Sequence, residues 1–240
     1  MELQGKTVLV TGATSGIGRA TAIDLAAAGM NVVATGRRAD ELEKLAEEVG
    51  RDRVHVVPAD MADELTPGRL IDAADAAFGR LDACISNAGV MHIGTVETAD
   101  VEAMCNMVRV NYEAVVRLAY ACLRKFKPQG HGHLIHVSST VAIHARPGTA
   151  AYAGTKAAIE TFTASLRREM AGTGVKVGWI APGLTDTHLQ DHFPQHPAET
   201  MGIEKMPDGH DLARGIRFML EQPDHVHAAM LTIMPSEQAT

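Results

Sequence analysis

Residues 7–18, TVLVTGATSGIG, join a short run of β-branched and apolar residues directly to a glycine-rich turn and the start of a helical segment. Between a first strand and a helix, such a turn lets backbone N–H groups and the positive end of the helix dipole approach a pyrophosphate. The spacing is not G-x-G-x-x-G, and glycine-rich turns also occur for packing alone. The position after the first strand favours dinucleotide binding, to which we assign Gly12, Thr14, Ser15, Gly16, Ile17 and Gly18.

Outward from this turn, β-branched runs alternate with helical stretches. The pattern predicts strands over 7–11, 31–35, 53–57, 81–86, 133–138, 175–180 and 230–233. It predicts helices over 17–28, 40–49, 64–77, 101–125, 151–171 and 210–221. Most early strands are continuously apolar, as expected in a parallel sheet covered on both faces. We therefore expect an α/β protein in which residues 1–240 form a single-domain Rossmann-type doubly wound fold, a seven-stranded parallel sheet with helices on both faces.

The composition argues against several classes of protein. A length of 240 residues with 46% hydrophobic content suits one α/β domain. The formal charge of −7 and the scattered basic residues argue against a nucleic-acid partner. The sequence has neither a signal-peptide pattern nor an apolar span long enough for a membrane helix, so we expect a soluble cytoplasmic protein with no membrane partner. Three cysteines without C-x-x-C spacing support neither a disulfide framework nor a zinc site.

The regular alternation stops between Gly183 and Gly209, where prolines interrupt short apolar fragments. Long irregular segments in compact domains are usually functional covers or disordered. This one follows the sixth predicted strand, on the side where open α/β sheets bind ligands, so we expect a substrate lid around 184–209. His188, His192 and His196 have helical spacing, but Pro194 and Pro197 oppose a continuous helix, no carboxylate or cysteine pattern completes a site, and we expect no metal.

The second predicted strand ends in ATGRR, where Gly36 takes the place at which a fold selective for NAD carries an acidic residue. The missing acid removes repulsion of a 2′-phosphate, and the guanidinium of Arg37 is suited to bind that phosphate by charge-assisted hydrogen bonds. Arg38 is a second candidate for the same contact. The alternative is that both arginines belong to a solvated helix start. We predict NADP(H) as the cofactor.

Tyr152 and Lys156 stand one helical turn apart in AYAGTKAAI, with Ser139 thirteen residues before the tyrosine. Residues at i and i+4 share a helix face, so the phenol and the ammonium are expected to be neighbours. A nearby cation favours the phenolate, which predicts an acid/base device with a tyrosine pKa below its usual value of about 10. As an isolated pair, the two residues would favour the simpler interpretation of an exposed aromatic and a solvated cation on a helix surface.

Together these motifs resemble the short-chain dehydrogenase/reductase family over essentially the whole chain. SNAG at Ser86–Gly89 is similar to the family's N-N-A-G, and APG at Ala181–Gly183 to its P-G turn. The family's catalytic tetrad corresponds to Asn111, Ser139, Tyr152 and Lys156. Further cofactor contacts implied by the resemblance are Asp60, Met61, Asn87, Ala88, Gly89, Tyr152, Lys156, Pro182, Gly183, Thr185 and Thr187. Ser86 and Ala142 depart from the pattern, which affects backbone geometry rather than chemistry.

By this resemblance, Tyr152 exchanges a proton with the substrate oxygen while hydride passes at the nicotinamide. Ser139 would steady that oxygen, Lys156 would hold the nicotinamide ribose, and Asn111 would hold a water that links the lysine to solvent. Thr187 would contact the carboxamide. Within the family, GRR, PGLTDT and LTIMPSEQ are similar to bacterial clavulanate dehydrogenase and 3-hydroxy acid dehydrogenase types.

The expected activity is NADP(H)-dependent interconversion of a secondary alcohol, hydroxy acid or hydroxy aldehyde with its carbonyl compound. A non-catalytic NADP(H)-binding redox sensor and a dehydratase or epimerase of the same family are the alternatives. The family also implies a homodimer or homotetramer assembled through the two long helices. Possible pocket residues, for which packing roles are equally compatible with the pattern, are Met91, His92, His144, Arg146, Leu184, Leu189 and Phe193.

Overall fold

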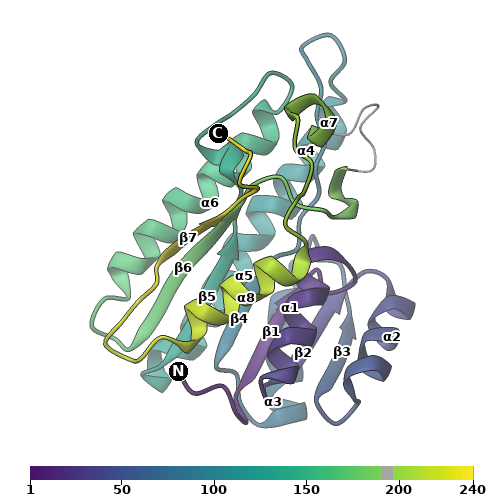
Figure 1. Ribbon diagram of the computed structural model, residues 1–240. Helices are drawn as coiled ribbons and strands as arrows, with labels where there is room; N and C mark the ends of the chain where they lie inside the picture. The colour runs from purple at the N-terminus through teal and green to yellow at the C-terminus, as the bar shows by residue number, and fades with distance from the viewer. Residues whose placement is uncertain (191–196, 240) are drawn as a thin grey trace.

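One parallel sheet forms the centre of the computed structural model, which describes residues 1–190 and 197–239 (Figure 1). Its strands are β1 (Thr7–Thr11), β2 (Asn31–Gly36), β3 (Val54–Pro58), β4 (Ala83–Ser86), β5 (Gly132–Val137), β6 (Val175–Pro182) and β7 (Met230–Ile233). They lie in the order β3-β2-β1-β4-β5-β6-β7, and each neighbouring pair is parallel. The predicted doubly wound α/β fold is confirmed.

Helices cover both faces of this sheet (Figure 1). One face carries α1 (Gly16–Ala27), α2 (Ala39–Val49) and α8 (Gly209–Glu221), and the other carries α3 (Thr66–Phe78), α5 (Ala114–Gln129) and α6 (Ala150–Glu169). Val8 and Val10 pack into the first of these two cores, whereas Leu9 packs into the second. Because alternate strand residues point to opposite faces, a strand buried on both sides is apolar at every position.

The predicted helix over 101–125 is divided into three elements. These are α4 (Val101–Val108), the π-helical turn η1 (Arg109–Glu113) and α5. Asn111 lies in the π-helical turn, where its Oδ1 accepts a hydrogen bond from the Val90 N–H at 2.9 Å and its Nδ2 donates to the Val90 carbonyl at 2.8 Å. A π-turn adds a residue to one helical turn, which local periodicity does not predict. The break therefore accompanies a tertiary contact between residues that are distant in sequence.

The segment between β6 and α8 contains more regular structure than the sequence suggests. A 3-10 turn, η3, spans His188–Gln190, and a short helix, α7, spans Pro197–Met201. His192, Phe193, Pro194 and His196, which the sequence analysis placed in this segment, lie outside the described residues. A second 3-10 turn, η2 (Thr140–Ala142), directly follows Ser139 at the end of β5.

Asp82 anchors the amino-terminal edge of the sheet, because its buried carboxylate joins the starts of β1 and β4. It accepts a hydrogen bond from the Thr7 N–H at 2.9 Å and two from the Arg80 guanidinium at 2.7 Å. Burial by itself would raise the pKa of Asp82, but the bonds from Arg80 and Thr7 and the charges of Arg80 and Lys6 outweigh it and lower that pKa. The carboxylate is therefore a stabilising group.

Asp82→Asn is expected to lower the free energy of unfolding by about 1–3 kcal/mol at neutral pH, because the Thr7 N–H and the Arg80 guanidinium lose their charged acceptor. The folded-state pKa lies below the unfolded value of about 3.9, so this stabilisation is present above the unfolded pKa and is lost as pH falls through the folded pKa. Urea denaturation between neutral and acidic pH measures it. Exposed Asp72 provides the control, and equal stability of Asp82→Asn and Asp72→Asn would contradict the assignment.

Candidate active site

A cavity of about 810 Å³ opens at the carboxyl-terminal edge of the sheet. Because all strands are parallel, the residues after β1, β4, β5 and β6 meet at this edge, and the strand order reverses between β1 and β4. The cavity extends from the arginines after β2 to the middle of the segment after β6. It is lined by all the sequence-predicted cofactor and catalytic residues except Gly18 and Asn111.

The glycine turn after β1 is shaped by close packing against β4. Gly12 has φ +68°, and a Cβ there would lie 2.9 Å from the Ala88 Cα. Gly16 has φ +53°, and its Cβ would lie 3.2 Å from the Thr187 side chain, so the segment after β6 lies directly over the turn. The Ser15 side chain does not cap α1, which leaves the backbone N–H groups of the first helical turn for an anion in the cavity.

Gly18 is closely packed and does not line the cavity. A Cβ at this position would lie 2.3 Å from the Gly12 carbonyl oxygen and 2.4 Å from Asn87 Nδ2. The side chain of Asn87 donates to the Thr11 carbonyl at 2.9 Å, and the Thr11 hydroxyl accepts the backbone N–H groups of Asn87 and Ala88, both at 3.0 Å. Thr11, which the sequence analysis did not single out, thus joins the ends of β1 and β4.

The far end of the cavity carries two exposed arginines after β2. Arg38 donates through Nη2 to the carbonyl of Thr14 at 3.2 Å and to its hydroxyl at 3.0 Å, so this guanidinium is held over the glycine turn. Arg37 is exposed beside it and also lines the cavity. A Cβ on Gly36 would lie 2.7 Å from the Thr14 methyl group, so a longer residue there requires Thr14 to move. These features leave a cationic, unobstructed rim.

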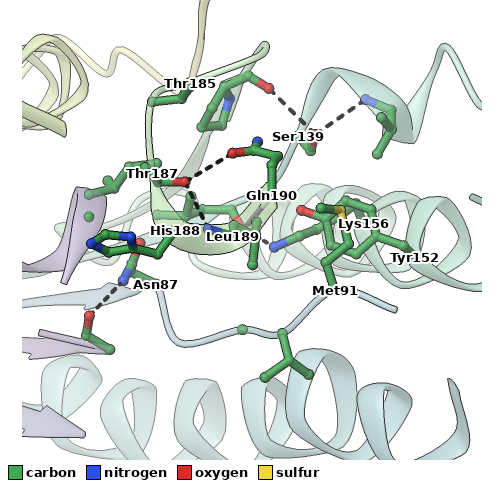
Figure 2. Close-up of a pocket in the computed structure, with 18 of the residues that line it drawn as sticks. Asn87, Met91, Ser139, Tyr152, Lys156, Thr185, Thr187, His188, Leu189 and Gln190 are labelled. Atoms are coloured by element: carbon green, nitrogen blue, oxygen red, sulfur yellow. Dashed lines mark hydrogen bonds between the residues drawn. The ribbon is translucent and has the colours of Figure 1, made fainter. Parts of the chain in front are cut away.

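At the opposite end, Ser139, Tyr152 and Lys156 meet in the cavity from β5 and α6 (Figure 2). The Lys156 Nζ lies 5.7 Å from the centre of the Tyr152 ring and donates to the Val137 carbonyl at 2.8 Å. The Ser139 hydroxyl accepts the Val141 N–H at 3.4 Å and donates to the Pro182 carbonyl at 3.5 Å. The Ser139 hydroxyl also lies near enough to the Tyr152 hydroxyl to oppose the rise in the tyrosine pKa. The three polar side chains therefore line the same part of the cavity.

Electrostatics at this point differ from the sequence-based expectation. Burial raises the pKa of Tyr152 to about 12, while the nearby Ser139 hydroxyl acts in the opposite direction. Burial also lowers the pKa of Lys156 to about 8, against the charge of Glu160. The prediction that Lys156 brings the Tyr152 pKa below its usual value is therefore wrong here. The cost of burying a phenolate outweighs the lysine, whose Nζ is directed to the Val137 carbonyl.

Asn111 lies behind the cavity wall rather than on it. It is 1% exposed, and besides its two bonds to Val90 its Nδ2 approaches the Thr155 hydroxyl at 3.5 Å. Thr155 in turn donates to the Tyr152 carbonyl at 2.7 Å. Asn111 therefore contacts α6 through the Thr155 hydroxyl, within one turn of the Tyr152–Lys156 pair.

Two glutamines line the cavity although the sequence analysis did not assign them to the site. Gln238, in the carboxyl-terminal tail, accepts the Leu184 N–H at 2.8 Å and approaches the Thr140 hydroxyl at 3.4 Å. Gln190 is buried against Thr187 in the segment after β6 (Figure 2). Gln238 is the last residue of LTIMPSEQ and Gln190 lies in the segment predicted as a lid, but neither was assigned to the site from the sequence. Of the weaker pocket candidates, those that line the cavity are Met91, His92, His144, Arg146, Leu184 and Leu189, whereas Phe193 is outside the described residues.

The described part of the chain contains neither a cluster of metal ligands nor a helix that could span a membrane. Across residues 1–190 and 197–239, no group of three or more His, Cys, Asp or Glu side chains is gathered in a way that could hold a metal ion. Over the same ranges, no helix combines the length and apolar character needed to cross a membrane.

A doubly wound sheet with a glycine-turn cavity at its switch point defines a dinucleotide-binding protein of the Rossmann type. The chain belongs to the short-chain dehydrogenase family, which its residues 6–198 match, and is an oxidoreductase of that family. An uncharacterized oxidoreductase of Staphylococcus haemolyticus is 34% identical over 234 residues, covering 98% of this chain and 99% of the relative.

Solved structures agree with this assignment. A serine dehydrogenase in a closed form complexed with NADP+ superposes with a TM-score of 0.90 at 28% identity, covering 98% of this chain and 96% of the other. A 3-ketoacyl-(acyl-carrier-protein) reductase from Brucella melitensis complexed with NADH has a TM-score of 0.89 at 29% identity, covering 96% of this chain and 97% of the other. The same fold and family therefore occur with either coenzyme.

Proposed function

We propose that this oxidoreductase transfers hydride between NADP(H) and a secondary alcohol, hydroxy acid or hydroxy aldehyde, or the corresponding carbonyl compound. The observation that carries the proposal is the convergence of Ser139, Tyr152 and Lys156 in the cavity that also contains the glycine turn. The nicotinamide supplies or accepts the hydride. The protein supplies orientation and a polar site for the substrate oxygen.

In the proposed reaction, Tyr152 donates its hydroxyl proton to the carbonyl oxygen during reduction and accepts it back during oxidation. A buried phenol with a pKa near 12 holds its proton at neutral pH, which is the form that reduction requires. Ser139 steadies the same oxygen through its hydroxyl. Lys156 holds the nicotinamide ribose, and Asn111 supports α6 from behind the cavity. Oxidation is expected to accelerate as pH rises, because it requires the deprotonated phenol.

The proposed preference for NADP(H) rests on the cationic rim formed by Arg37 and Arg38 and on the absence of an acid at Gly36. Asp60, Met61 and the SNAG turn are proposed to contact the adenosine half. Pro182, Gly183, Thr185 and Thr187 are proposed to contact the nicotinamide half. The segment around 184–209 is proposed as a lid, since residues on both sides of its undescribed part, Leu189 and Met201, line the cavity.

A coupled substrate screen tests this function. Purified protein is mixed with NADPH and a panel of ketones, 2- and 3-oxo acids and aldehydes, and with NADP+ and the matching alcohols, and absorbance of the reduced coenzyme is followed. Turnover of at least one pair is expected, with products identified by mass spectrometry. Coenzyme binding without turnover would favour a redox sensor. Loss of water or inversion without net coenzyme change would favour a dehydratase or epimerase. The narrower resemblance to hydroxy acid dehydrogenases stays a prediction that the same panel decides.

Assembly into a homodimer or homotetramer is also proposed. Val101 and Val108 on α4 and Tyr120 on α5 are 64%, 42% and 42% exposed, and a second copy of the chain would remove such apolar side chains from water. Light scattering coupled to gel filtration is expected to give a mass of two or four chains of 25.5 kDa. A monomer at micromolar concentration would contradict this.

A further inference from the structure

Glu160 is a half-buried carboxylate on α6 that the roles described so far do not use. Its Oε1 accepts a hydrogen bond from the Ser138 hydroxyl at 2.7 Å, and the Trp179 indole lies near enough to its carboxylate to oppose the rise in its pKa. Ser138 directly precedes Ser139 at the end of β5, and Trp179 lies on β6. One side chain therefore joins the helix that carries Tyr152 to two neighbouring strands.

The hydrogen bond from Ser138 to Glu160 also orients the residue that follows β5. The Ser138 hydroxyl lies 2.7 Å from Glu160 Oε1 and 3.4 Å from the Lys156 carbonyl oxygen. A hydroxyl has one proton to donate, and the shorter bond to a charged acceptor is the stronger one. Ser138 is 2% exposed, so water does not replace Glu160 at low cost. The carboxylate thus orients the residue before Ser139.

The charge of Glu160 also faces Lys156. The two residues are four apart on α6, which places their side chains on one helix face. The other titratable groups near Lys156 are Tyr152 on α6 and His136 on β5. Burial lowers the pKa of His136 to about 3, so this ring is neutral.

The pKa of Glu160 is raised overall, and three contacts limit that rise. Burial raises the pKa of Glu160, while the bond from Ser138, the charge of Lys156 and the nearby Trp179 indole act against that rise. Among the described residues, Glu160 is the carboxylate whose charge opposes the burial of the Lys156 ammonium. A buried cation is costly without such a partner.

We propose that Glu160 is a positioning residue whose charge balances the buried ammonium of Lys156 and whose hydrogen bond from Ser138 sets Ser139 against Tyr152. The kinetic part of this inference rests on the proposed function of the Ser139–Tyr152–Lys156 cluster. The electrostatic part concerns the folded protein alone and is measured without turnover.

The first experiment titrates Lys156 by NMR in protein carrying carbon-13 at the lysine side-chain termini. The Lys156 signal is assigned by its loss in Lys156→Met. In Glu160→Gln, which keeps an acceptor for Ser138 but removes the charge, the pKa of Lys156 is expected to fall by about 0.5–1 unit, since an opposite charge one turn away favours the ammonium. Exposed Glu169→Gln is the control. An unchanged Lys156 titration in Glu160→Gln would overturn the proposal.

The second experiment compares pH profiles of kcat for alcohol oxidation. Removing a nearby negative charge lowers the apparent pKa values of the coupled pair Tyr152 and Lys156. The pH profile of Glu160→Gln is therefore expected to move to lower pH by a similar amount. Glu160→Ala removes the charge and the hydrogen bond together and is expected to lose about 10-fold or more in kcat. A loss of kcat with an unshifted profile in Glu160→Gln would indicate a merely structural role and overturn the proposal. If the wild-type protein turns over no substrate, the proposed function fails, while the NMR titration still decides this inference.

Discussion

Tyr152→Phe is expected to reduce turnover by about 100-fold to 10,000-fold, the range that general acid/base catalysis typically contributes. The substitution removes the hydroxyl that lies near Ser139 and leaves the buried ring in place. Because phenylalanine is slightly less polar and similar in shape, folding and NADPH affinity should change little. Steady-state kinetics with the first active substrate from the screen, with NADPH fluorescence titration in parallel, measures both quantities.

Tyr120→Phe is the matched control, since Tyr120 is 42% exposed on α5 and does not line the cavity. It should retain wild-type rates. Retention of activity in Tyr152→Phe would end the proposed mechanism. Equal losses of NADPH binding and of turnover would instead assign Tyr152 to coenzyme binding.

Arg37→Asp is expected to weaken NADPH binding by about 10-fold to 100-fold, because charge-assisted hydrogen bonds contribute about 1.5–3 kcal/mol and the new carboxylate repels a 2′-phosphate. NADH lacks that phosphate, so its affinity should stay within a few-fold. Calorimetric or fluorescence titration with both coenzymes gives the ratio. Because Arg37 is exposed, the substitution should leave folding unchanged.

Arg51→Asp is the control for the same change of charge, since Arg51 is an exposed arginine that pairs on the surface with Glu43 and Glu47. It should leave the preference between coenzymes unchanged. If Arg37→Asp also leaves it unchanged, Arg38 becomes the phosphate contact, and a wild-type protein that binds NADH as tightly as NADPH would refute the predicted cofactor.

Local sequence was sufficient for the fold. The structure of a continuous apolar strand such as β1, or of a helix end at a glycine such as Gly79, depends on residues that are neighbours in sequence. The positions of these features were therefore predicted within two residues. The π-helical turn at Asn111 was missed, because it accompanies hydrogen bonds to Val90, twenty-one residues earlier in the chain. The glycine turn was located, but Gly18 was assigned to the cofactor although it packs against Gly12 and Asn87.

The sequence by itself determined the sheet, the glycine turn and the family, since these depend on residue types at short spacing. Only the tertiary structure decided that Tyr152 is a weaker acid than free tyrosine, that Glu160 bonds to Ser138 and that Gln238 of the tail lines the cavity. The reason is physical: a pKa depends on desolvation and on charges brought together by folding, and neither is a property of the local sequence.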